Sequence, residues 1–145
     1  MDRRSFLALL LAAAAAPAAA DTVNARGGLA IGGYDPVAYF TQGRPRRGAN
    51  MHYLDWNDAR WLFVTAANRD AFAADPERYA PRYGGWCAYG MAQGYKAPID
   101  PDAWSIVEGR LYLNYSNSIR RTWLGDVPGF ISKADAHWPA VSAAP

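Results

Sequence analysis

The stretch Trp104-Ser105-Ile106-Val107-Glu108-Gly109-Arg110-Leu111-Tyr112-Leu113 carries the clearest structural signal in this chain of 145 residues. Apolar and polar residues alternate on both sides of Glu108-Gly109, which is the pattern of two antiparallel strands joined by a tight turn. We therefore predict a β-hairpin over residues 104–113. A second hairpin is predicted upstream, where strand-prone residues at 52–56 and 60–65 are joined by residues 57–59.

Helical segments are expected before, between and after the hairpins. Asp35 is predicted to cap a short helix that begins at Pro36, because these residue types are favoured at those two positions. Further helices are expected from Asn68, from Asp75 to Tyr79, over residues 86–91, from Ser116 or Asn117 to Gly125, and from about Pro128 to Trp138. Together these elements predict an α+β fold, with a small antiparallel sheet built from two hairpins and packed with several short helices.

Residues 1–20 have the layout of an export signal. Arg3 and Arg4 precede an apolar stretch over residues 6–16, and small residues at 18–20 fit a cleavage site before Asp21. The apolar stretch is well short of the roughly 20 residues that span a bilayer, so we expect no permanent membrane anchor. The paired arginines resemble a twin-arginine signal, and an ordinary secretory leader is the alternative. The sequence thus predicts a periplasmic protein.

The rest of the chain has the length of one domain. We expect a loose N-terminal segment over 21–31, a single monomeric domain over 32–139 and a C-terminal tail over 140–145. The chain has 15 basic and 13 acidic residues and a formal net charge of +2. This near-neutral balance argues against electrostatic binding of nucleic acid, so no nucleic-acid partner is expected.

Cys87 is the only cysteine. A single thiol excludes an internal disulfide, a four-thiolate iron–sulfur cluster and the two-cysteine attachment of c-type haem. Cys87 follows Gly84-Gly85, which are expected to leave room for a ligand, and is expected in the first turn of a helix. Backbone N–H groups there favour a thiolate. The alternative is a small buried thiol that packs as a hydrophobic residue.

Candidate site residues follow from this thiol. Met91 lies four positions after Cys87, which places both sulfurs on one helical face and suits a copper-like ion such as Cu(I). His52 is a third candidate metal ligand, although it is distant in sequence, and for Met91 a core role is the alternative. A small-ligand site is predicted to involve Cys87 together with Tyr34, Asp35, Tyr83 and Trp86, with helix capping as the alternative role of Asp35.

An ordered set of motifs extends over most of residues 32–139. The motifs cover residues 33–40, 68–72, 75–79, 83–88, 100–104, 109–115, 134–135 and 138–139. Together they resemble the YHS-domain proteins, in particular the exported branch labelled YHS domain-containing (seleno)protein. This resemblance implies a compact α+β fold and a link to metal biology. Val64 and Asn68 stand where metal-linked members carry cysteines, whereas some relatives hold selenocysteine at the position of Cys87, which implies a functional role there.

These features predict a periplasmic YHS-domain protein whose single thiol binds a soft transition metal or a small ligand, or handles redox chemistry. A thiol-dependent redox enzyme is one alternative. The other is a non-catalytic module that binds a periplasmic protein partner, in which the thiol only packs.

Overall fold

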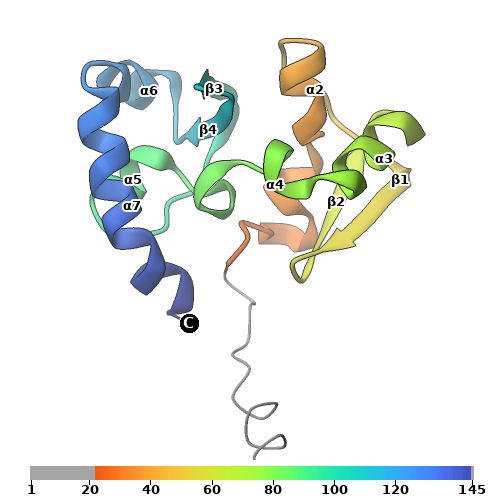
Figure 1. Cartoon of the computed structure of the whole chain (residues 1–145), viewed down its shortest axis with the longest axis horizontal. Helices are drawn as coiled ribbons and strands as arrows, with labels where there is room; N and C mark the ends of the chain where they lie inside the picture. Colours follow the sequence, from red (N-terminus) through yellow and green to blue (C-terminus); the bar gives the residue numbers. More distant parts are fainter. Residues whose placement is uncertain (1–21, 145) are drawn as a thin grey trace, which may run out of the picture.

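The computed structural model describes residues 22–144 and confirms the α+β class. Two lobes lie side by side (Figure 1). The N-terminal lobe contains η1 (Arg26–Gly28), η2 (Ala30–Gly33), α2 (Pro36–Thr41), β1 (Ala49–Trp56), β2 (Ala59–Phe63), α3 (Ala66–Ala74) and α4 (Pro76–Tyr79). A single turn, η3 (Arg82–Gly85), leads into the second lobe, which contains α5 (Ala88–Ala92), β3 (Asp100–Val107), β4 (Arg110–Asn114), α6 (Asn117–Leu124) and α7 (Val127–Ala143).

Both predicted hairpins are confirmed. β1 pairs with β2 through a turn at Asn57 and Asp58, and β3 pairs with β4 through a turn at Glu108 and Gly109. All four turn residues have positive φ, between 51° and 76°. Two consecutive positive φ angles define the turn whose twist matches that of two antiparallel strands, and Asn, Asp and Gly adopt it readily.

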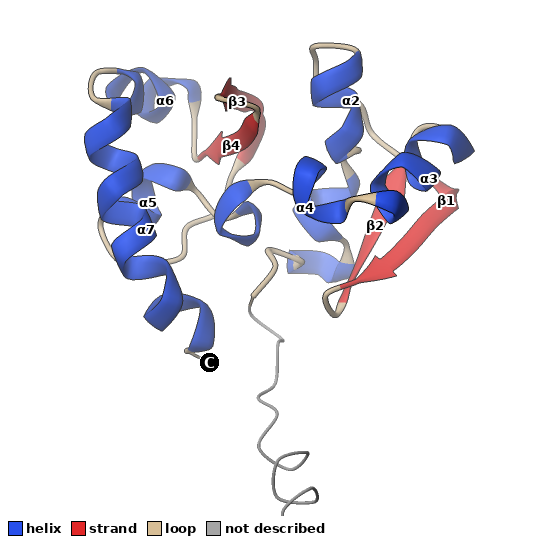
Figure 2. Ribbon diagram, in the orientation of Figure 1, coloured by secondary structure: helices blue, strands red, loops and turns tan. Residues whose placement is uncertain are grey.

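The hairpins form two separate two-stranded sheets rather than one small sheet (Figure 2). In the first hairpin, Arg60 of β2 also forms a bridge with Leu29, so the N-terminal segment takes up part of the free edge of that strand. In the second, Leu111 and Leu113 of β4 pack into one hydrophobic cluster with Phe63, whereas Tyr112 packs into another with Trp123. β4 therefore lies between two cores and contributes alternate residues to each.

Local capping interactions begin most of the helices. Asp35 caps α2 as expected, and of the two residues expected to cap α6, Ser116 is the one that does so. The prediction for Asn68 is wrong, because Thr65 caps α3 and Asn68 lies within that helix. Cys87 is the N-cap of α5 rather than a residue of its first turn.

Two predicted boundaries are wrong. The loose segment expected at 21–31 is ordered over residues 22–31, where Val23, Ala30 and Ile31 are buried in the N-terminal core. The loose tail expected from residue 140 is helical up to Ala143, because α7 continues past Pro139. The predicted export signal lies outside the described residues. Within residues 22–144, no helix has the length and apolar character needed to cross a membrane.

Candidate functional site: the Cys87 pocket

The backbone around Cys87 is held from two sides. The Cys87 N–H donates to the carbonyl of Ala97 at 3.0 Å, and the Cys87 carbonyl accepts from Met91 N–H at 2.9 Å. Gly90 lets the 95–97 segment approach α5 closely, because a Cβ at this position would lie 3.0 Å from the Ala97 Cβ. These contacts fix the sulfur at the N-terminal end of α5.

The Cys87 sulfur has polar neighbours although the residue is only 1% exposed. Its Sγ accepts from Gly90 N–H at 3.4 Å and donates to Asn114 Oδ1 at 3.5 Å. Asn114 is fully buried at the end of β4, and its Oδ1 also accepts from Tyr89 N–H at 3.0 Å. The Nδ2 group of Asn114 has no hydrogen-bond partner among the described residues.

Burial raises the pKa of the Cys87 thiol above its ordinary value. Backbone N–H groups of Gly90, Tyr115 and Tyr89 act in the opposite direction but do not outweigh the loss of water. The expected N–H groups at the helix start are therefore present. The expectation of a favoured thiolate is wrong, because desolvation dominates.

A pocket of about 270 Å³ reaches Cys87 from the surface. Its other lining residues come from α5, from the loop after it, from the residue that follows β4 and from α6: Tyr89, Gly90, Tyr95, Ala97, Tyr115 and Ile119. None of these side chains is charged. Tyr95 and Tyr115 are each more than half exposed, which is unusual for such large side chains and is typical of a binding surface.

Tyr83 and Trp86 are close to Cys87 in sequence, but neither lines this pocket. The Tyr83 hydroxyl donates to Asp135 Oδ1 on α7 at 2.9 Å, and burial together with this carboxylate raises the pKa of Tyr83. Trp86 is buried in the same hydrophobic cluster as Trp123, with the Lys96 ammonium 5.8 Å from its ring centre. Neither residue therefore forms part of the pocket surface.

The structure does not bring Tyr34 or Asp35 into the Cys87 pocket. Asp35 is fully buried, and its two carboxylate oxygens accept four hydrogen bonds, from Val37, Ala38, Val64 and Asn68. Its acceptor positions are thus used within the fold. Tyr34 lies against Arg47, whose guanidinium carbon is 4.8 Å from the ring centre.

The three candidate metal ligands do not converge. Met91 lies in the same turn as Cys87 but is fully buried in the cluster that contains Trp123 and Ala134. His52 is on β1, in the opposite lobe from α5 (Figure 1). Within residues 22–144, no group of three or more His, Cys, Asp or Glu side chains is placed to hold a metal ion. Cys87, Met91 and His52 therefore do not form one three-ligand metal site.

The sequence prediction missed most of the pocket. Asn114 carried one usable signal, because a polar residue follows the apolar alternation of Leu111, Tyr112 and Leu113 and its side chain has to find partners inside the fold. The tyrosines at 89, 95 and 115 carried no local signal. Only the tertiary fold places their segments around one sulfur.

Comparison of the chain with known family models, curated proteins and solved structures finds no match.

Proposed function

We propose that this chain is a periplasmic member of the YHS-domain proteins and that it binds a small, uncharged, mostly apolar ligand in the Cys87 pocket. The leader pattern of residues 1–20 and the ordered motifs between residues 33 and 139 support the location and the family. The pocket carries the ligand proposal, because it joins two exposed tyrosines to a buried thiol.

The lining selects the ligand by its chemistry. A charged molecule would lose its hydration without gaining a charged partner, since no lining side chain is ionic. An apolar molecule gains about 25 cal/mol for each Å² of apolar surface that it buries. The hydroxyls of Tyr95 and Tyr115 are available for one polar group on the ligand, and the sulfur offers a soft, polarisable contact.

Protection of Cys87 by indole tests this proposal. Methyl methanethiosulfonate, a small neutral reagent, should label Cys87 slowly in the native protein, and indole should slow the labelling in a saturable way. Mass spectrometry follows the reaction. A thiol that stays unlabelled until the protein is denatured, or labelling that indole leaves unchanged, would show that the pocket does not give a ligand access to the sulfur.

Ile119→Glu provides a variant in which the fold is preserved and the pocket is altered. Residue 119 lines the pocket and lies at the third position of α6, three residues after its cap Ser116. A glutamate there completes a capping box, so the variant should fold at least as well as the wild type. The new carboxylate at the pocket wall should abolish protection by indole. Ser118→Glu, on the exposed part of the same helix turn and outside the pocket, is the matched control and should keep it.

A thiol-dependent redox enzyme is a second candidate, because the pocket reaches the Cys87 sulfur and the backbone N–H groups beside it would stabilise a thiolate once it forms, although burial raises the pKa of the thiol. The sulfur would attack hydrogen peroxide and break its O–O bond, taking one oxygen as a sulfenic acid while the other leaves as water. Two equivalents of an external thiol would then restore Cys87 and be oxidised to a disulfide. Stoichiometric loss of the thiol with hydrogen peroxide, at a rate well above that of free cysteine, would support this role. A rate equal to or below that of free cysteine would count against it.

A further inference from the structure

A second pocket lies between the two lobes and shares no lining residue with the Cys87 pocket. Its volume is about 190 Å³. Its walls come from the β1–β2 turn, the start of β4, η3 and α7, together with the N-terminal residues Thr22 and Val23. Segments far apart in the sequence therefore meet there, as at many ligand sites between structural units.

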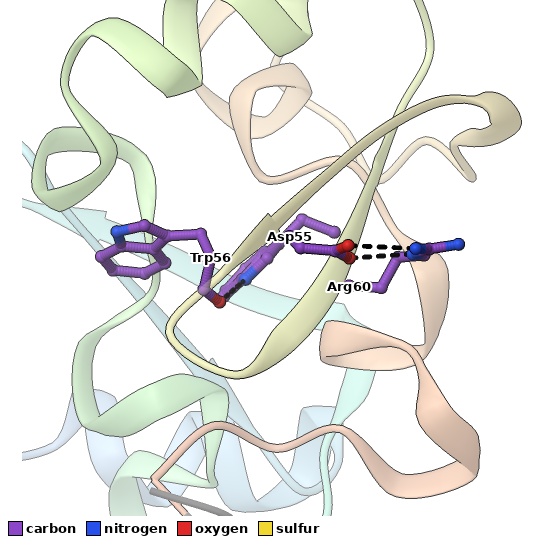
Figure 3. Close-up of polar contacts among 4 residues, drawn as sticks. Asp55, Trp56 and Arg60 are labelled. Atoms are coloured by element: carbon purple, nitrogen blue, oxygen red, sulfur yellow. Dashed lines mark hydrogen bonds and ion pairs between the residues drawn. The ribbon is translucent and has the colours of Figure 1, made fainter.

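Aromatic rings form much of this interlobe pocket. Trp56, Trp61 and Trp138 all line it, and Trp61 is almost completely buried, with its ring centre 5.9 Å from that of Trp56. Figure 3 shows the Trp56 ring projecting away from Asp55 and Arg60, which form an ion pair with an N–O distance of 2.8 Å on the other side of the hairpin. The half-buried rings of Trp56 and Trp138 offer flat apolar surface to a planar molecule.

The charged residues of the pocket favour an anion. Arg82 and Arg110 line it, and among the described residues Glu77 is its only acidic member. Arg82 bonds Asp135 through Nη2 at 3.3 Å, but its Nε is buried without a hydrogen-bond partner in the described part of the chain. The Arg110 side chain is exposed and makes no hydrogen bond or ion pair within residues 22–144. A buried guanidinium N–H without a partner is unusual in a folded protein, and a bound water or an anion beside Arg82 would satisfy it.

We propose that the interlobe pocket binds a small planar carboxylate, with its ring against the tryptophan side chains and its carboxylate at Arg82 and Arg110. Guanidinium groups match carboxylates in shape and charge, and hydrogen bonds between them are about twice as strong as neutral ones. The modest volume limits the ligand to a single ring or a molecule of similar size. This site is independent of the proposed function at Cys87.

Benzoate and its neutral analogue benzamide test the proposal by isothermal titration calorimetry on the mature protein. Benzoate should bind in a saturable way and about tenfold more tightly than benzamide, and its affinity should fall with added salt. Equal affinity for the two compounds, or no benzoate binding at millimolar concentration, would overturn the proposal. Benzoate should also leave the labelling rate of Cys87 unchanged, because the two pockets are separate.

Arg110→Gln tests the site without disturbing the fold, since the side chain it replaces makes no hydrogen bond or ion pair within the described residues. We expect benzoate affinity to fall about tenfold while benzamide affinity stays the same. Arg121→Gln removes the same charge from the exposed face of α6, outside the pocket, and is the control. If the two variants weaken benzoate binding equally, Arg110 has no specific role and the proposed site is wrong.

Discussion

Replacement of Asp35 by asparagine should strongly destabilise the protein. The carboxylate is fully buried and ties together three segments. Its Oδ1 accepts from Val37 N–H at 2.8 Å and from Ala38 N–H at 3.2 Å, which caps α2. Its Oδ2 accepts at 2.8 Å from both Val64 N–H and the Asn68 side-chain amide, which holds the end of β2 and helix α3 against that cap.

The size of the effect follows from these four bonds. Asparagine keeps the shape of aspartate but turns one acceptor oxygen into a donor, so two of the four donors lose their acceptor. A hydrogen bond to a charged group contributes about 1.5–3 kcal/mol, and the expected loss in free energy of unfolding is therefore about 3–6 kcal/mol. Rotation of the Asn68 side-chain amide would recover one of the lost hydrogen bonds, which places the expected loss in free energy of unfolding at about 3 kcal/mol. Even this is a large share of the roughly 5–15 kcal/mol that stabilises a typical domain.

Urea unfolding followed by tryptophan fluorescence measures this change, with an unchanged slope against urea showing that the midpoint reports stability alone. Asp126→Asn is the matched control, because Asp126 caps α7 through a bond to Gly129 N–H at 3.1 Å but is exposed. Because this cap is exposed, Asp126→Asn should lower the free energy of unfolding by about 1 kcal/mol or less. If Asp35→Asn costs no more than Asp126→Asn, the four hydrogen bonds of Asp35 do not stabilise the fold, and a ligand-binding role for Asp35 is open again.

Three further predictions concern the thiol and the glycine pair. Gly84→Ala should destabilise the protein much more than Gly27→Ala, because a Cβ at Gly84 would lie 1.8 Å from the Thr22 carbonyl oxygen whereas Gly27 has open space. Gly27→Ala should cost about 1–2 kcal/mol, the penalty for a non-glycine residue in the left-handed conformation. Equal unfolding midpoints would contradict the close packing at Gly84. The raised pKa of Cys87 means that the unfolded thiol ionises first, so stability should fall as pH rises above about 8.5 by up to about 1.4 kcal/mol per pH unit. Cys87→Ala should lack this slope, and identical pH profiles from urea unfolding would show that the thiol is not desolvated. Copper content after purification from the periplasm should be equal in wild type and Cys87→Ser, and a loss of stoichiometric copper in the variant would restore the metal hypothesis.

Elements with local chemical signals were predictable from the sequence. The turn at Glu108-Gly109 and the caps at Asp35 and Ser116 depend on residues within a few positions of one another, and all three are confirmed. Asn68 shows where this approach fails. Its sequence context resembles a cap, but its side chain bonds Asp35, 33 residues away, and the nearer Thr65 caps the helix instead. A polar side chain with two possible partners cannot be assigned from spacing alone.

The glycine pair before Cys87 and the segment before η2 were both misjudged, and for the same reason. Gly84 and Gly85 were expected to leave room for a ligand, and residues 21–31 were expected to be loose. In the structure, residues of the N-terminal segment fill the space next to Gly84 and Gly85. A Cβ at Gly85 would lie 2.5 Å from Ile31 Cγ2, and Asn24 bonds the carbonyl oxygens of both glycines, at 2.8 Å and 3.1 Å.

Both glycines have positive φ, 63° and 85°, so the turn itself also requires them. A double glycine in a sequence thus indicates close approach by some group without indicating which, and here that group is the chain's own N-terminal segment. The consequence for function is specific. The pocket that reaches Cys87 is lined by Tyr95 and Tyr115 and not by Gly84 or Gly85, so the proposed ligand would reach the sulfur past these two tyrosines. Replacing Tyr115 by alanine should therefore speed the labelling of Cys87 by methyl methanethiosulfonate, and the same change at the exposed Tyr53 of the other lobe should not.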